Sequence, residues 1–276
     1  MSEAAPLTVI EPYESRLSVG FRELWQYREL LYFLVWRDLK VRYKQSAIGV
    51  AWAVLQPVAT MGLFTIVFGH LVRVKTNGVP YPPFVLTGLI AWQLVAHALS
   101  QGATSLTVSR GLVTKVYFPR LLVPAATVVA GVVDFLIAAA VLVVFIAAYG
   151  IHPPARLPFA LVFVVLLFAT ALGIAFWLSA LNVNYRDVQY AIPFLSQLWF
   201  FATPIVYSAT IVPAGWRPVL GINPLAGVVQ GLRWSIFRGT PLPAGLVAVS
   251  STAAVVLLVT GLLYFRATER DFADVV

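Results

Sequence analysis

Six long, mostly apolar stretches run through this sequence and limit what it can fold into. They cover residues 48–71, 84–106, 121–149, 157–181, 190–207 and 243–265. A helix of about 20 apolar residues crosses the hydrocarbon core of a bilayer. Because only 11% of the residues are charged and 60% are apolar, a soluble fold could not cover its surface with polar groups. The sequence therefore predicts an all-α integral membrane protein with six transmembrane helices.

The basic residues predict the orientation of these segments. Most of the 19 Lys and Arg residues lie on the side of the membrane that would hold both termini. Because Lys and Arg accumulate on the cytoplasmic side of multi-pass proteins, we expect both termini in the cytoplasm. The net charge of +8 is then explained by sidedness, so membrane lipids and no nucleic acid are the expected partners.

Two regions do not fit a simple six-helix bundle. Residues 1–45 contain a short apolar run, Leu30–Trp36, that is flanked by charged residues, and the wider stretch around it mixes Trp, Tyr and Phe with Arg and Lys. This pattern predicts a cytoplasmic N-terminus with an amphipathic interface helix, or alternatively a cytosolic helix docked on protein. Residues 208–242, within the transmembrane domain at 46–276, lie on the exterior side but are too apolar for a solvated loop. We expect re-entrant helices there, before the last span.

Several kinds of chemistry are missing from the sequence. There is no Cys, and no Lys follows a Gly, so disulfides and a Walker A phosphate loop are excluded. His70, His97 and His152 have no metal-ligand spacing. We therefore expect no catalytic residue, no metal and no cofactor in this chain. Energy for any uphill transport would have to come from a separate subunit.

Asp134 is the one acidic residue within the predicted spans, near the middle of the third. Because a charge at the bilayer centre costs about 2.5–3.5 kcal/mol on insertion scales, Asp134 is expected to face the bundle interior, a subunit contact or water. It is either a polar site on a translocation path or a structural group, which is hydrogen-bonded between helices or neutral. No cation within the spans is an obvious partner, and a single acid cannot form a proton relay.

Four stretches carry a family resemblance. They are RDLKVRYKQSAIGVAWAVLQP at 37–57, GLVTKVYFPRLLVP at 111–124, LNVNYRDVQYAIPFLSQLWFFATPIVY at 181–207 and NPLAGVVQGLRWSIFRG at 223–239. In this order and spacing they resemble the ABC-2 type permeases of the polysaccharide export family, which includes O-antigen and teichoic-acid exporters. The resemblance implies a transport subunit rather than an enzyme. Its implied substrate is an undecaprenyl-pyrophosphate-linked polysaccharide that crosses the bacterial plasma membrane.

The resemblance also implies partners. A second copy of the chain would form a homodimer, and two ATP-binding cassette subunits would bind ATP and Mg. Three alternatives stay open. The chain could belong to an ABC-2 exporter of drugs or simple lipids, or be a passive channel, which would need no ATPase. It could also be a polytopic membrane enzyme acting on carrier-linked sugars, although its acidic residues form no DxD motif.

Residues 109–120, on the cytoplasmic side between the second and third spans, are the candidate for coupling to the ATPase. The segment can form a short helix ended by Pro119, with apolar side chains surrounded by basic ones. That arrangement suits a cleft on a partner, whereas the alternative is an ordinary basic loop. The predicted coupling residues are Arg110, Leu112, Lys115, Tyr117, Phe118 and Arg120.

Four basic residues are candidates for binding the carrier headgroup. They are Arg37, Arg42, Lys44 and Arg186, which are expected at the inner headgroup level. Arg binds the oxygens of a pyrophosphate with two nitrogens at once. The alternative is that these residues anchor the chain to anionic lipids without any specific substrate.

Aromatic residues are candidates for lining the path of the sugar chain, because they stack on the C–H faces of sugars and Trp and Tyr add a polar group. The candidates for the path are Trp52, Phe64, Trp199, Phe200, Phe201 and Tyr207, and those for its outer mouth are Trp216, Trp234 and Phe237. The alternative is that they form lipid-facing belts or pack in the core.

Overall fold

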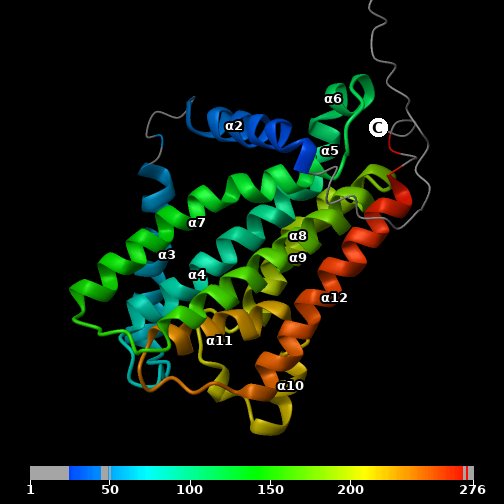
Figure 1. Ribbon diagram of the computed structural model, residues 1–276. Helices are drawn as coiled ribbons and strands as arrows, with labels where there is room; N and C mark the ends of the chain where they lie inside the picture. Colours follow the sequence, from blue (N-terminus) through cyan, green and yellow to red (C-terminus); the bar gives the residue numbers. More distant parts are fainter. Residues whose placement is uncertain (1–24, 45–48, 50, 270–271, 273–276) are drawn as a thin grey trace, which may run out of the picture.

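The computed structural model describes residues 25–44, 49, 51–269 and 272, and within these residues helices are the only regular secondary structure (Figure 1). In chain order the elements are α2 (Arg28–Lys44), α3 (Ala51–Phe64), η1 (Thr65–Leu71), α4 (Tyr81–His97), η2 (Ala98–Gly102), α5 (Ala103–Val108), α6 (Arg110–Lys115), α7 (Leu122–Ala148), η3 (Leu157–Phe159), α8 (Ala160–Asn184), α9 (Val188–Ala202), η4 (Ala209–Ile211), η5 (Ala214–Trp216), α10 (Arg217–Leu220), α11 (Pro224–Ile236) and α12 (Ala244–Thr268). The predicted all-α fold is confirmed.

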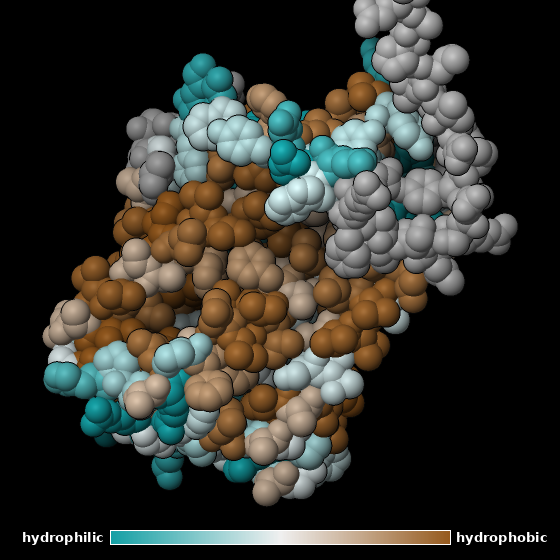
Figure 2. All heavy atoms as spheres, in the orientation of Figure 1, coloured by the Kyte–Doolittle hydropathy of each residue, from teal (hydrophilic) through white to brown (hydrophobic). Residues whose placement is uncertain are grey.

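In the described part of the chain, five continuous helical stretches are long and apolar enough to cross a membrane. They are Ala51–Leu71, Tyr81–Val108, Leu122–Ala148, Leu157–Asn184 and Ala244–Thr268. Figure 2 shows the corresponding apolar band between two polar ends of the molecule. The remaining predicted span contains α9, which has only 15 residues. The count of six spans therefore stays a prediction.

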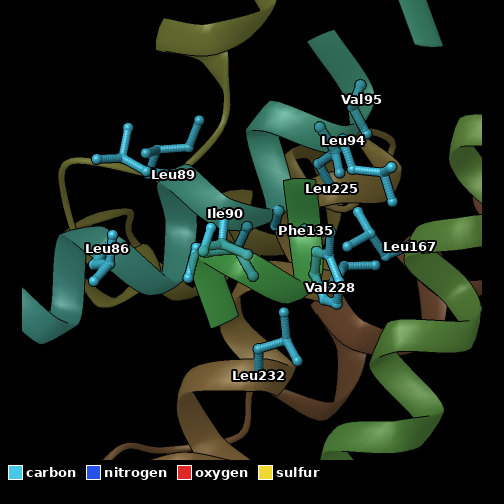
Figure 3. Packing of buried hydrophobic residues seen from close by; sticks show 14 of the residues in the cluster. Leu86, Leu89, Ile90, Leu94, Val95, Phe135, Leu167, Leu225, Val228 and Leu232 are labelled. Atoms are coloured by element: carbon cyan, nitrogen blue, oxygen red, sulfur yellow. The ribbon is translucent and has the colours of Figure 1, made fainter. Parts of the chain in front are cut away.

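The core lies between α4, α7, α8 and α11 (Figure 3), and α12 packs against α8 and α11. Of the most apolar part of the Tyr81–Val108 stretch, 72% is buried, whereas the corresponding share for Ala51–Leu71 is 11%. Leu86, Leu94 and Val95 on α4 contribute to the cluster with Phe135 on α7 and Leu167 on α8. Helix α4 is therefore the centre of the bundle, and α3 stands at its edge.

Helix α11 is a short buried helix in the region where re-entrant structure is expected. The Asn223 side chain caps it by accepting a hydrogen bond from the Leu225 amide at 3.0 Å, and Pro224 occupies its first turn. With 13 residues it spans about 20 Å, which is less than the about 30 Å of a hydrocarbon core. Its depth in the bilayer stays a prediction.

Helix α2 lies crosswise over the end of the bundle that also holds α6 and the end of α12 (Figure 1). Its buried Leu34 packs in a second apolar cluster with Leu106, Phe118 and Phe265. Its Trp36 and Phe33 remain exposed. Much of the predicted 1–45 region falls outside the described residues, so the boundary at residue 45 stays a prediction.

The segment after α5 differs in one respect from the expectation. Helix α6 ends at Lys115 and Val116 is extended, with φ −124° and ψ 134°, so the helix does not continue to Pro119. Phe118, which precedes Pro119, is sterically disfavoured in the helical region, and β-branched Val116 is a weak helix former. The segment is therefore about one and a half helical turns followed by an irregular stretch.

Candidate functional site

A polar cleft of about 840 Å³ opens between α2, α3, α7 and the continuous helix formed by α4, η2 and α5. Its described charged lining residues are Arg37, Asp38, Arg42 and Asp134. Its neutral polar lining includes Gln56, Gln93, Ser100, Gln101 and Thr104, and its aromatic lining includes Trp52 and Trp92. An apolar bundle therefore contains a concave surface with charged, amide, hydroxyl and indole groups, which is where ligand binding is expected.

Asp134 on α7 is held by two consecutive residues of α2. Arg42 Nη1 forms a salt bridge with Asp134 Oδ2, and the Tyr43 hydroxyl donates to Oδ1. The sequence offers no cation within the spans, and the partner of Asp134 is instead Arg42 on α2, outside the spans. Helix α2 crosses α7 and places its last turn against it.

His97 on α4 completes this cluster. Its Nε2 lies 3.0 Å from the Thr127 carbonyl, and its Nδ1 lies 3.2 Å from Arg42 Nη2. Arg42 Nη2 lies 3.1 Å from Nε2 as well. A neutral imidazole that donates from Nε2 to the carbonyl can accept from Arg42 at Nδ1. Gly131 makes room for the ring, since a Cβ there would lie 2.7 Å from His97 Cδ2.

The Tyr43 hydroxyl remains a donor at neutral pH. Burial, and then the hydrogen bond and negative charge of the neighbouring Asp134 carboxylate, together raise its pKa from 10.0 to about 12. Asp134 therefore keeps a hydrogen-bond donor that does not depend on Arg42.

The other predicted headgroup residues are not equivalent. Arg37 lines the cleft, where its Nη2 lies 2.9 Å from Asp38 Oδ1 and 3.3 Å from Ser109 Oγ. Lys44 and Arg186 are exposed and are not among the residues that line the cleft. The structure thus brings two of the four candidates, Arg37 and Arg42, into one site.

Helix η2 shapes the wall of the cleft opposite α2. Its π-helical turn follows His97 and exposes both Ser100 and Gln101, and such turns are frequent at functional sites. Sequence reasoning missed this wall. The signal was present, because Gln93, His97 and Gln101 recur every four residues in an otherwise apolar segment and so share one helical face.

Several predicted path residues form an aromatic cluster beside the cleft. Phe64 on α3 stacks on Phe200 of α9, with ring centroids 5.7 Å apart. Phe200 also meets Trp92 edge-to-face at 5.4 Å and Phe201 at 5.2 Å. Trp52 lines the cleft and is 54% exposed. The structure thus brings Phe64, Phe200 and Phe201 into one cluster, and the role of these residues in binding stays a prediction.

The aromatic residues near α11 have mostly packed environments. Trp199 Nε1 donates to Asn223 Oδ1 at 2.9 Å. The Arg156 guanidinium lies over the Trp234 ring, with 4.8 Å between Arg156 Cζ and the ring centroid. Phe237 is buried and Tyr207 is half-buried against the core, whereas Trp216 is exposed. Within one chain, therefore, Trp216 is the candidate of the outer mouth that is most open.

Arg233 on α11 forms a second buried cationic site that the sequence reasoning did not single out. Its guanidinium is fully buried and donates to the carbonyls of Phe84, Pro204, Ile205 and Tyr207 at 2.5–3.2 Å. It also lies 3.5 Å from the centroid of the Phe84 ring. Main-chain carbonyls carry no sequence signal, which is why this site was missed.

The predicted coupling residues are partly accessible. Arg110, Lys115 and Tyr117 are exposed, the last at 70%. Their neighbours belong to the fold, because Leu112 is half-buried, Phe118 is buried, and the Arg120 amide donates to Glu269 Oε1 at 2.9 Å. The Arg120 guanidinium also contacts the Glu269 carbonyl. The open part of the segment is thus smaller than the predicted set.

The residues that could hold a metal are too few for a site. Among the described residues, no group of three or more His, Asp or Glu side chains is arranged to bind an ion. The chemistry of the cleft is instead that of hydrogen bonding and charge, from two guanidiniums, three primary amides and two indoles. Such a set suits a ligand that carries both anionic and hydroxyl groups.

Comparison with known proteins covers nearly the whole chain. The family described as ABC-2 type transporter matches residues 29–237. The O-antigen export system permease protein RfbA of Myxococcus xanthus is 32% identical over 256 residues, which are 92% of this chain and 97% of the relative. RfbA of Klebsiella pneumoniae is 28% identical over 90% of this chain and 95% of its own length. The polysialic acid transport protein KpsM of Escherichia coli is 23% identical over 85% of this chain and 91% of its own length.

Proposed function

The chain belongs to the ABC-2 type transporter family, and from this premise we propose that it is the permease subunit of an exporter of lipid-linked polysaccharide. As a member it is a transport subunit rather than an enzyme, and members of the family work with ATP-binding subunits. The proposed substrate class rests on what the similar proteins are named for. They are named for O-antigen export and for polysialic acid transport, and each match covers at least 85% of this chain.

The cleft supports this substrate class on chemical grounds. Amides such as Gln93 and Gln101 bind sugar hydroxyls, and the indoles of Trp52 and Trp92 can stack on sugar rings. Arg42 supplies a guanidinium, which suits the oxygens of a diphosphate. A polysaccharide on an undecaprenyl pyrophosphate carrier combines both kinds of group, whereas a simple lipid or an apolar drug would use few of these side chains.

A homodimer is part of the proposal. Helix α3 is largely exposed along one edge of the cleft. Helix α9, which contacts the end of α3 through Phe200, exposes the apolar side chains of Tyr190, Phe194 and Leu198. A second copy related by twofold symmetry would place the same surfaces against each other. The two clefts would then face a common path, which a single bundle is too tightly packed to enclose.

The proposed orientation places both termini in the cytoplasm of a bacterium, at its plasma membrane. Helices α2 and α6 lie at one end of the molecule (Figure 1), and the basic residues of this end suit the cytoplasmic side. The partner subunits, which would hold ATP and Mg, would dock there on the exposed side chains of Arg110, Lys115 and Tyr117. Membrane lipids would contact the outward aromatic residues of α2.

Reconstitution tests the proposed function. The chain and the ATP-binding subunit encoded beside it are placed in proteoliposomes with a lipid-linked glycan, and transfer to the opposite leaflet is measured. We expect transfer only with ATP and both subunits. Transfer without ATP would indicate a passive channel, and ATP-driven movement of simple lipids or drugs but not of the glycan would replace the proposed substrate class.

Docking of the ATPase has its own test. Charge reversal of Arg110 and Lys115 to Glu should abolish co-purification of the ATP-binding subunit, because both side chains are exposed at the proposed contact. The matched control replaces them with Lys and Arg respectively, which keeps the charge and should keep co-purification. Equal co-purification of both variants would contradict the docking site.

A further inference from the structure

The cleft holds two cations, and both are already neutralised by the protein. Arg37 pairs with Asp38, and Arg42 pairs with Asp134. The charged residues in the described lining are these four, so their charges sum to zero. An anionic headgroup that enters the cleft therefore finds no free cation unless one of the two pairs separates.

The Arg42 pair is the one arranged to separate. Each of its two side chains is 30% exposed, so both remain accessible from the cleft. Arg42 uses only Nη1 toward the carboxylate, while Nη2 turns to the ring nitrogens of His97 at 3.1–3.2 Å. The guanidinium is thus not in the two-nitrogen contact that it makes best with a carboxylate or phosphate. A phosphate group could offer that contact.

Asp134 would not be left without a partner by such an exchange. Its Oδ1 accepts from the Tyr43 hydroxyl, which is a bond separate from the salt bridge. By contrast, Asp38 in the other pair lies next to Arg37 on the same helix, so this pair imposes no constraint between helices. Separation of Arg42 from Asp134 removes one of the two side-chain links from the last turn of α2 to α7.

We propose that Asp134 is a built-in competitor for the substrate: it occupies Arg42 in the empty protein and releases it to the diphosphate of the lipid carrier. This inference rests on the proposed function and adds its regulation. The salt bridge between α2 and α7 is closed when the cleft is empty and opens when a diphosphate is bound. Occupancy of the cleft is thereby communicated to the position of the interface helix.

Binding of farnesyl diphosphate, a short isoprenyl diphosphate, tests the exchange. The full chain is placed in phosphatidylcholine nanodiscs, and equilibrium binding is measured for the wild type, Asp134→Asn, Arg42→Gln and the double variant. Asp134→Asn should bind about tenfold more tightly, because the competitor is gone, and Arg42→Gln about tenfold more weakly. In the Arg42→Gln background the gain from Asp134→Asn should vanish, since the released cation is then missing.

Lys40→Gln is the matched control, because it removes one exposed positive charge from α2 at a position that does not line the cleft. It should change binding less than about twofold. Asp134→Asn that binds like the wild type or more weakly, with an unchanged melting temperature, would overturn the inference, as would an equal gain with and without Arg42.

Tyr43→Phe decides the question if Asp134→Asn does not fold. Removal of the hydroxyl leaves Asp134 with Arg42 as its main partner, so the exchange becomes more costly and farnesyl diphosphate should bind about threefold more weakly. Unchanged or tighter binding by Tyr43→Phe would contradict the proposal. These binding measurements do not depend on the transport assay. A failure of glycan transport would therefore contradict the proposed function, whereas the exchange between Asp134 and the diphosphate would still be tested by binding.

Inorganic pyrophosphate separates the lipid headgroup from a free anion. We expect it to show the same order of variants but to bind more weakly than farnesyl diphosphate, because the isoprenyl chain adds apolar contact within the bilayer. Equal affinity for the two compounds would contradict the assignment to a lipid carrier.

Discussion

Arg42 and Arg233 each bring a positive charge into the helical bundle, but different kinds of group stabilise the two charges. Arg233 is fully buried and all its hydrogen bonds go to main-chain carbonyls. Arg42 is partly exposed, and its partners are the side chains of Asp134 and His97. A side chain can rotate and exchange partners, whereas a carbonyl at the end of a helix moves only with the backbone. The Arg233 site is therefore suited to hold the fold, and the Arg42 site is suited to respond to a ligand.

The positions of the two sites agree with this division. Arg233 joins α11 to the chain after α9 and to the first turn of α4, in the region that forms the end opposite α2 (Figure 1). Arg42 joins α2 to α7 and lies in the cleft. Each site also has a glycine that makes room for it, which is Gly88 beside Arg233 and Gly131 beside His97.

Arg233→Met should have the largest effect on stability. It leaves the carbonyls of Pro204 and Ile205 buried without their donors, and each buried acceptor that loses its partner costs about 1–3 kcal/mol. We expect a drop in melting temperature of about 10 °C in detergent. Arg238→Met is the control, because Arg238 is exposed just beyond the same helix. Equal melting temperatures for the two variants would contradict a structural role of the carbonyl site.

Substitution of the two glycines sharpens the contrast. A Cβ at Gly88 would lie 3.1 Å from the Ile205 Cα, which is backbone, while a Cβ at Gly131 would meet the ring of His97 beside an open cleft. Although the contact at Gly131 is shorter, the imidazole can move away. Gly88→Ala should therefore destabilise by about 1–3 kcal/mol and Gly131→Ala by less. Thermal unfolding of both variants measures this, and the reverse order would show that the Arg42 region is the more rigid one.

Arg42→Gln should change stability by only about 1 kcal/mol or less, since the pair that it breaks is partly exposed. Chemical or thermal unfolding beside Lys40→Gln measures the difference. If Arg42→Gln instead destabilised as strongly as Arg233→Met, the charged cluster would be a structural element, and the distinction between the two arginines would be lost.

The smallest expected effect concerns pH. Burial and Asp134 raise the pKa of Tyr43 from 10.0 to about 12. Because the pKa in the folded state is above that in the unfolded state, the stabilisation from Tyr43 is complete below pH 10.0 and is lost as the pH rises through about 12. The stability difference between the wild type and Tyr43→Phe should shrink across this window. A difference that stays constant with pH would show that the hydroxyl is not held by Asp134.

Much of the fold follows from local sequence patterns. The apolar stretches that form α3, α4, α7, α8 and α12 are long enough to be recognised one at a time. The buried α11 was also visible, because Asn223 and Pro224 give a helix start within an apolar region. The segment of α9 is less decisive, since its helix stops at Ala202, before the predicted end of the span.

The sites were less predictable because they join residues that are distant in sequence. Asp134 suggested a polar contact, but its cation lies outside the spans on α2, and the crossing of α2 over α7 is a tertiary feature. Arg233 could be recognised as a charge within an apolar helix, but its carbonyl partners depend on how the chain turns after α9. The amide wall at Gln93 and Gln101 was readable from its four-residue spacing.

We propose that Arg42 serves the transported substrate, whereas Arg233 serves the fold. The most direct measurement is the rate of ATP-driven glycan transfer in proteoliposomes by the wild type and Arg42→Gln, each corrected for the amount of folded complex and ATPase. We expect Arg42→Gln to reduce transfer by about tenfold, while its melting temperature and ATPase association stay close to those of the wild type. Transfer at the wild-type rate by Arg42→Gln would contradict this proposal.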